Sequence, residues 1–150
     1  MDNKAIIDAV NDLITVNYDG ERGYKEAAED VTDARLKSWF KEYAQQRYDF
    51  GHELKGELSQ LGGTPDKGTS IAADIHRIFI DLKSAIAGND EQAVINECIR
   101  GEENAIERYD AVLTHDALPA SVRTVVSRQR NQIQAALGKM QDLKSAFATT

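Results

Sequence analysis

Residues 36–65 read LKSWFKEYAQQRYDFGHELKGELSQLGGTP, and their pattern is the clearest indication of the fold. Its apolar residues return every three or four positions, and this spacing places them on one face of an α-helix. They are Leu36, Phe40, Tyr43, Phe50, Leu54 and Leu61. Gly62 and Gly63, followed by Pro65, form a helix-ending signal. The stretch therefore predicts one long helix over about residues 33–61 that buries a single apolar face.

The rest of the chain has the same spacing of apolar residues. It predicts three more long helices and one shorter helix, at about residues 4–31, 90–115 and 119–147 and at 70–87. The long helices have similar lengths, about 40 Å each at 1.5 Å per residue, which suits a single bundle. The chain holds only two prolines, and no stretch alternates apolar with polar residues long enough to suggest a strand. We therefore expect an all-α protein.

The connections between the helices predict how they are arranged. A two-residue turn at Thr32 and Asp33 makes the first two long helices antiparallel, and a turn around Asp116 does the same for the last two. Segment 62–89 is long enough to travel back along the bundle, and two helical hairpins joined by such a crossover form a ferritin-like four-helix bundle. An up-and-down bundle with a fifth packed helix is the competing architecture. We expect one domain over residues 1–150, because this length is typical of a single core.

Composition limits the classes of partner and the compartment. The chain has 18 basic and 25 acidic residues, a net charge of -7. Nucleic acids and anionic membranes need clustered Lys and Arg, so we expect neither as a partner. The single cysteine, Cys98, excludes an intramolecular disulfide and fits a reducing compartment. Acidic residues interrupt every apolar run near the N-terminus, which is unlike a signal peptide or a membrane span, and we expect a cytoplasmic protein.

Several short motifs occur together along the chain. They are Asp19-Gly20-Glu21-Arg22-Gly23-Tyr24, Gln46-Arg47, Leu61-Gly62-Gly63-Thr64-Pro65, His76 before Leu82-Lys83, Arg100-Gly101-Glu102-Glu103 with Tyr109, and Leu118-Pro119 with Val122 and Gln129. As a set they resemble an uncharacterised bacterial family of ferritin-like four-helix-bundle proteins, over about residues 5–145. The resemblance implies the fold but does not imply an activity.

The residues that face the bundle interior bear on whether it holds a metal centre. An active ferritin-like di-iron centre takes a Glu from each of two helices and a Glu-x-x-His pair from each of the other two. No Glu-x-x-His occurs in this chain. The best-placed positions hold Arg47 and Phe50 on the second long helix, and Gln129 and Gln132 on the last. Amides are poor iron ligands, and Glu102 is the inward carboxylate that remains on the third long helix.

An inward arginine predicts a different kind of centre. A guanidinium inside a bundle must be paired, and a carboxylate on a facing helix is its natural partner. We therefore predict a polar network of Arg47 and Glu102, steadied by Gln129, Gln132 and Tyr109, in the space of a metal site. This interpretation includes no catalytic residue, no metal and no cofactor.

The alternative is a metal site with unusual ligands. Its candidate ligands are Glu29, Glu102, Glu103 and His52, and the metal would be iron or manganese. Two functional hypotheses follow. The first is a non-catalytic helical module, related to stress, that forms a homo-oligomer or binds a protein partner. The second is an oxidoreductase or an iron-handling protein. Metal content of the purified chain distinguishes them.

Overall fold

The chain folds into long α-helices in a computed structural model, which describes residues 3–65 and 69–148. The helices are α1 (Asn3–Asp30), α2 (Ala34–Gln60), α3 (Thr69–Ala87), α4 (Glu91–Leu113) and α5 (Ala120–Ala148). Within the described residues there is no β-strand. The all-α class and the positions of the five predicted helices are confirmed, with ends that differ by a few residues at most.

The ends of α2 have local causes in the sequence. Asp33 precedes the helix, and its side chain accepts hydrogen bonds from the backbone N–H groups of Arg35 and Leu36. These N–H groups have no partner within the helix, so the carboxylate stabilises its first turn. At the other end, Gly62 has a φ of 78°, and the N–H of Gly63 donates to the carbonyl of Leu58. Glycine adopts this left-handed conformation without strain, so the helix ends there, as the sequence predicts.

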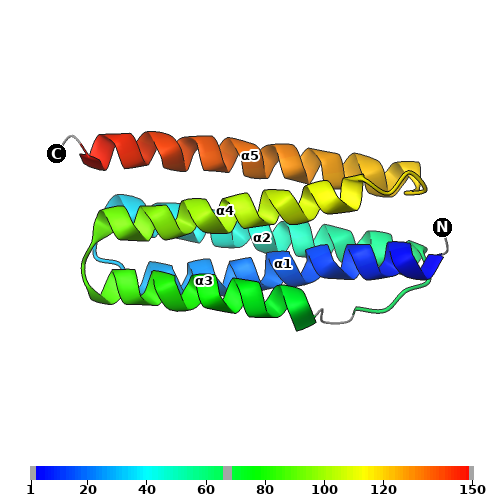
Figure 1. Cartoon of the computed structure of the whole chain (residues 1–150), viewed down its shortest axis with the longest axis horizontal. Coiled ribbons are helices and arrows are strands. Elements are labelled where there is room, and N and C mark those ends of the chain that lie inside the picture. Colours follow the sequence, from blue (N-terminus) through cyan, green and yellow to red (C-terminus); the bar gives the residue numbers. More distant parts are fainter. Residues whose placement is uncertain (1–2, 66–68, 149–150) are drawn as a thin grey trace.

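The helices form two antiparallel hairpins, α1 with α2 and α4 with α5 (Figure 1). Helix α3 belongs to the connection between the hairpins and packs against α1 and α4. Because this connection runs the length of the bundle, α4 runs in the same direction as α2. This is the crossover arrangement that the sequence predicts. None of the described helices combines the length and the apolar character that a membrane crossing needs.

Glycine allows α3 to lie close to α1. A Cβ atom at Gly23 of α1 would lie 1.8 Å from Cε1 of Phe79 on α3, a distance that no pair of unbonded atoms tolerates. Glycine at this position therefore leaves the space that the Phe79 ring occupies.

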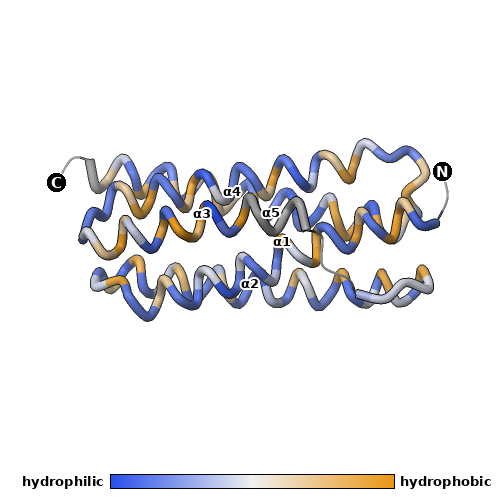
Figure 2. Tube along the Cα trace, turned by 60° about the horizontal axis from the view of Figure 1, so that its bottom comes forward, coloured by the Kyte–Doolittle hydropathy of each residue, from blue (hydrophilic) through white to orange (hydrophobic). Residues whose placement is uncertain are grey.

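The core consists of two apolar clusters. Figure 2 shows apolar and polar residues following each other in short runs along each helix, as expected of helices that bury one face. The first cluster includes Val10, Leu13, Leu54, Leu58, Val126 and Ile133, and the second includes Leu36, Phe40, Leu82, Ile95 and Met140. Asn17, Arg47 and Glu102 are buried, and each lies between the stretches of its helix that join the two clusters. A polar layer therefore separates two apolar halves.

Candidate functional site

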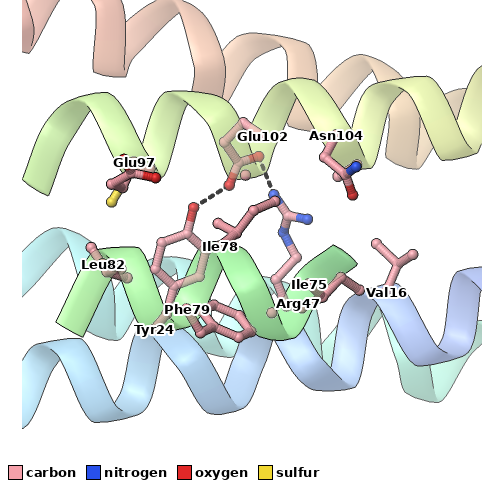
Figure 3. Close-up of a pocket in the computed structure, with 14 residues that line it drawn as sticks. Val16, Tyr24, Arg47, Ile75, Ile78, Phe79, Leu82, Glu97, Glu102 and Asn104 are labelled. Carbon is pink, nitrogen blue, oxygen red and sulfur yellow. Dashed lines mark hydrogen bonds and ion pairs between the residues drawn. The ribbon is translucent and has the colours of Figure 1, made fainter. Parts of the chain in front are cut away.

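Three side chains from three helices meet in this polar layer. Nη2 of Arg47 on α2 forms an ion pair with Oε2 of Glu102 on α4, and the hydroxyl of Tyr24 on α1 donates to Oε1 of the same carboxylate (Figure 3). Arg47 is 2% exposed and Glu102 is 1% exposed. We call Tyr24, Arg47 and Glu102 the buried triad. Each carboxylate oxygen of Glu102 thus has a protein donor.

The surroundings of the triad keep Tyr24 and Arg47 in defined protonation states. Burial lowers the pKa of Arg47, but the charge of Glu102, together with Tyr24, Tyr109 and the hydrogen bond to Glu102, raises the pKa above its ordinary value. Burial raises the pKa of Tyr24 well above 10, and the neighbouring carboxylate of Glu102 raises it further. The guanidinium therefore stays charged, and the Tyr24 hydroxyl keeps the proton that it donates.

A second group of polar side chains runs from the core to the surface. Asn17 donates from Nδ2 to the Tyr109 hydroxyl at 2.7 Å, and this hydroxyl donates to Oε1 of Gln129 at 2.6 Å. Gln129 then donates from Nε2 to Oε1 of Glu53 at 2.9 Å, and Glu53 is paired with Arg128. We call these five residues the Tyr109 chain. It begins at the fully buried Asn17 and ends at Arg128, whose side chain is 48% exposed.

The predicted polar network is thus divided between two hydrogen-bonded groups. Arg47 and Glu102 belong to the buried triad, whereas Tyr109 and Gln129 belong to the Tyr109 chain. The structure corrects the expected place of Gln132, because this residue is exposed. The buried line of α5 runs through Val126, Gln129 and Ile133 in steps of three and four residues. A helix position three residues after Gln129 falls beside this line, and Gln132 faces a surface hollow that His52 also lines.

Four members of these groups were not predicted from the sequence as polar partners; one is Arg128, which pairs with Glu53 at the surface. The other three are Tyr24, Asn17 and Glu53. A signal for Asn17 was present, because it follows the buried Leu13 by four residues and precedes Tyr24 by seven, so all three share one helix face. An amide at such a position needs an internal partner. Glu53 gave no such signal, because its side chain is 37% exposed.

The alternative ligand set is not assembled in this fold. Glu29, Glu103 and His52 are exposed, and each faces a different hollow of the surface. The His52 ring stacks on Tyr48, with the ring centroids 6.1 Å apart. The set of Glu29, Glu102, Glu103 and His52 was therefore wrong as one site. In the part of the chain that the structure describes, no three His, Cys, Asp or Glu side chains gather as a metal would require.

The residues at the centre do not fit a di-iron group. Such a group needs several carboxylates and imidazoles that converge on one point, but here the guanidinium of Arg47 contacts Glu102 directly. A fixed positive charge 4 Å from a divalent ion repels it by about 4 kcal/mol per unit charge at an effective dielectric near 20. The chemistry of the donor set therefore favours an internal ion pair.

Two helical hairpins joined by a crossover helix define a ferritin-like protein. A solved structure with this fold is the dodecameric thioferritin, the bacterioferritin-related protein from Bacteroides fragilis. It is 17% identical, with a TM-score of 0.76, and the match covers 99% of this chain and 89% of that chain. The chain belongs to the family described as "Domain of unknown function (DUF2383)", whose sequence model matches residues 5–115. The family resemblance is thereby confirmed. No curated protein matches the chain in sequence.

Proposed function

We propose that this chain is a non-catalytic ferritin-like module that acts through contacts on its surface, with further copies of itself or with a partner protein. One observation carries the proposal: both oxygens of the inward carboxylate, Glu102, already have donors from Arg47 and Tyr24. In a ferritin-like metal centre this carboxylate would be a ligand. Here it balances a buried positive charge.

Metal binding at this place would require the ion pair to break. A free guanidinium would then remain in a site from which water is largely excluded, because Arg47 is 2% exposed. Breaking a buried pair by removing one partner costs about 3 to 5 kcal/mol, in addition to the repulsion between the guanidinium and the ion. A metal would have to overcome both terms. For Glu102, the ion pair with Arg47 is therefore more stable than binding to a metal.

The self-association part of the proposal has separate support. The Bacteroides fragilis thioferritin is described as dodecameric, and this chain shares its fold. Among the residues whose burial the structure describes, Tyr48 and Ile80 are large apolar side chains that are exposed, at 45% and 52%. Tyrosine is enriched in the buried centre of protein interfaces, so the α2 surface around Tyr48 suits a contact between proteins.

The test is metal loading followed by measurement of size. The chain is incubated anaerobically with Fe(II) and Mn(II), passed through gel filtration with light scattering, and analysed for metal. We expect an assembly of more than one copy that holds no stoichiometric iron or manganese. An ion that survives the column, raises the melting temperature and disappears in Glu102→Ala would overturn the proposal in favour of the iron-handling alternative. Glu103→Ala is the matched control, because Glu103 is the exposed neighbour of Glu102. A strictly monomeric chain would contradict self-association.

A further inference from the structure

A small cavity lies beneath α3, beside the buried triad. Its volume is about 40 Å³, and its apolar walls include Val16, Ile75, Ile78, Leu82 and Ala105. Tyr24, Arg47 and Glu102 also line it, and Figure 3 shows their side chains among those of the cavity wall. The cavity therefore has an apolar lining with one polar side.

Arg47, which lines the cavity, has one donor without a hydrogen-bond partner. Nε of Arg47 is buried and unpaired, although Nη2 of the same side chain contacts Glu102. The guanidinium carries five N–H donors, and a buried charged donor without an acceptor is strongly unfavourable. Native proteins satisfy such groups with other protein atoms or with ordered water. The unpaired Nε–H and the adjoining cavity thus point to a missing acceptor.

We propose that this cavity binds one water molecule, which accepts a hydrogen bond from Nε of Arg47. A water needs a cavity of at least about 10 to 15 Å³, so 40 Å³ is enough room for one water. Purely apolar cavities stay dry, but this one has the triad on one side. The water donates in turn to Glu102, because a carboxylate has about four lone-pair sites and two donors are present here.

The charge around the cavity disfavours an anion as the occupant. Glu97 and Glu102 both line it, and their carboxylates repel a negative ion that approaches Arg47. A neutral molecule with both a donor and an acceptor matches the site. This inference rests on the metal-free ion pair proposed above. It adds that one water in the cavity beneath α3 contacts the pair.

Nuclear magnetic resonance on the full-length, ¹⁵N-labelled chain tests the inference directly. The Nε–H signal of Arg47 is assigned through its bonds, and its cross-peaks to water are recorded in the rotating frame. We expect a cross-peak with the sign of a through-space contact, which is opposite to the sign of proton exchange. An Arg47 Nε–H signal without such a cross-peak would overturn the proposal. Metal analysis of the same sample separates this failure from a failure of the proposed function.

Two glycine substitutions provide the matched test. A Cβ atom at Gly101 would meet Cγ2 of Ile78 at 3.6 Å, an ordinary contact between two residues that line the cavity. Gly56 is the control, because it lies within α2 and nothing is within 4 Å of a Cβ atom there. Gly56→Ala should raise the melting temperature by about 2 to 4 °C and keep the cross-peak. Gly101→Ala should remove the cross-peak and raise the melting temperature less. A persistent cross-peak, or a larger rise than the control, would contradict the water site.

Discussion

Two arginine–glutamate pairs that join α2 to other helices lie in very different surroundings. Arg47 and Glu102 form the buried triad with Tyr24, and their side chains are 3% and 1% exposed. Arg128 and Glu53 end the Tyr109 chain, and their side chains are 48% and 37% exposed. Bulk water solvates the second pair whether or not it forms, whereas the first pair is shielded from bulk water. The same two residue types thus form a surface pair of little energetic weight and a buried pair that the fold depends on.

Replacing the two arginines by leucine sharpens this comparison most strongly. Arg47→Leu should lower the free energy of unfolding by about 3 to 5 kcal/mol, because it leaves the carboxylate of Glu102 buried with no opposite charge. Arg128→Leu should change it by about 1 kcal/mol or less, because Glu53 remains partly solvated. Urea unfolding measures both. Equal losses in the two variants would mean that burial does not separate the pairs.

Removing single hydroxyl groups compares the two polar groups without changing any charge. Tyr109→Phe should cost about 1 to 3 kcal/mol, because it deprives Asn17 and Gln129 of a buried partner. Tyr24→Phe should cost a similar amount, because Glu102 loses one donor but keeps Arg47. Urea unfolding again provides the values. A Tyr24→Phe variant as unstable as Arg47→Leu would show that the hydroxyl, and not the ion pair, holds the centre.

Alkaline pH tests the protonation of the same tyrosines. Burial raises the pKa of Tyr24 and Tyr109 above the ordinary value of 10 and raises the pKa of Tyr43 to about 12. Above pH 10 the unfolded chain releases these protons while the folded chain retains them, so stability falls as pH rises from about 10 towards 12. Each tyrosine contributes up to about 1.4 kcal/mol per pH unit.

The control for this pH dependence is the removal of one tyrosine at a time. In Tyr24→Phe the free energy of unfolding should fall less steeply between pH 10 and 11. The difference in slope corresponds to about one proton, because this variant lacks one tyrosine that releases its proton on unfolding. Unfolding free energies at several pH values provide the slope. A slope that does not change in Tyr24→Phe would mean that its hydroxyl titrates alike in the folded and unfolded chain.

Local patterns in the sequence were enough to predict the fold and the pairing of Arg47 with Glu102. The spacing of apolar residues and the helix-ending signal at Gly62-Gly63 predicted where the helices lie. Both signals depend only on residues that are close together in the sequence. Arg47 and Glu102 could be paired in advance, because an inward charge requires an opposite charge nearby. A buried charge requires this partner whatever the exact geometry of the helices.

The remaining features depend on distances that a sequence does not contain. A shift of one position along α5 decides between an inward and an outward side chain, and Gln132 was placed wrongly for this reason. Tyr24 has an apolar ring and a polar tip, so its spacing indicated burial but not the bond to Glu102. The close packing of Phe79 on Gly23 depends on the separation of α1 and α3, which no local pattern specifies.

The most direct test of the account is a double-mutant cycle on Arg47 and Glu102. The central claim is that these residues form one buried ion pair at the place of a ferritin-like metal centre. Unfolding free energies are measured for the unchanged chain, Arg47→Leu, Glu102→Leu and the double variant. The account predicts that the double variant loses at least about 2 kcal/mol less than the sum of the two single losses, because no charge is left buried alone. Losses that simply add would contradict the pair.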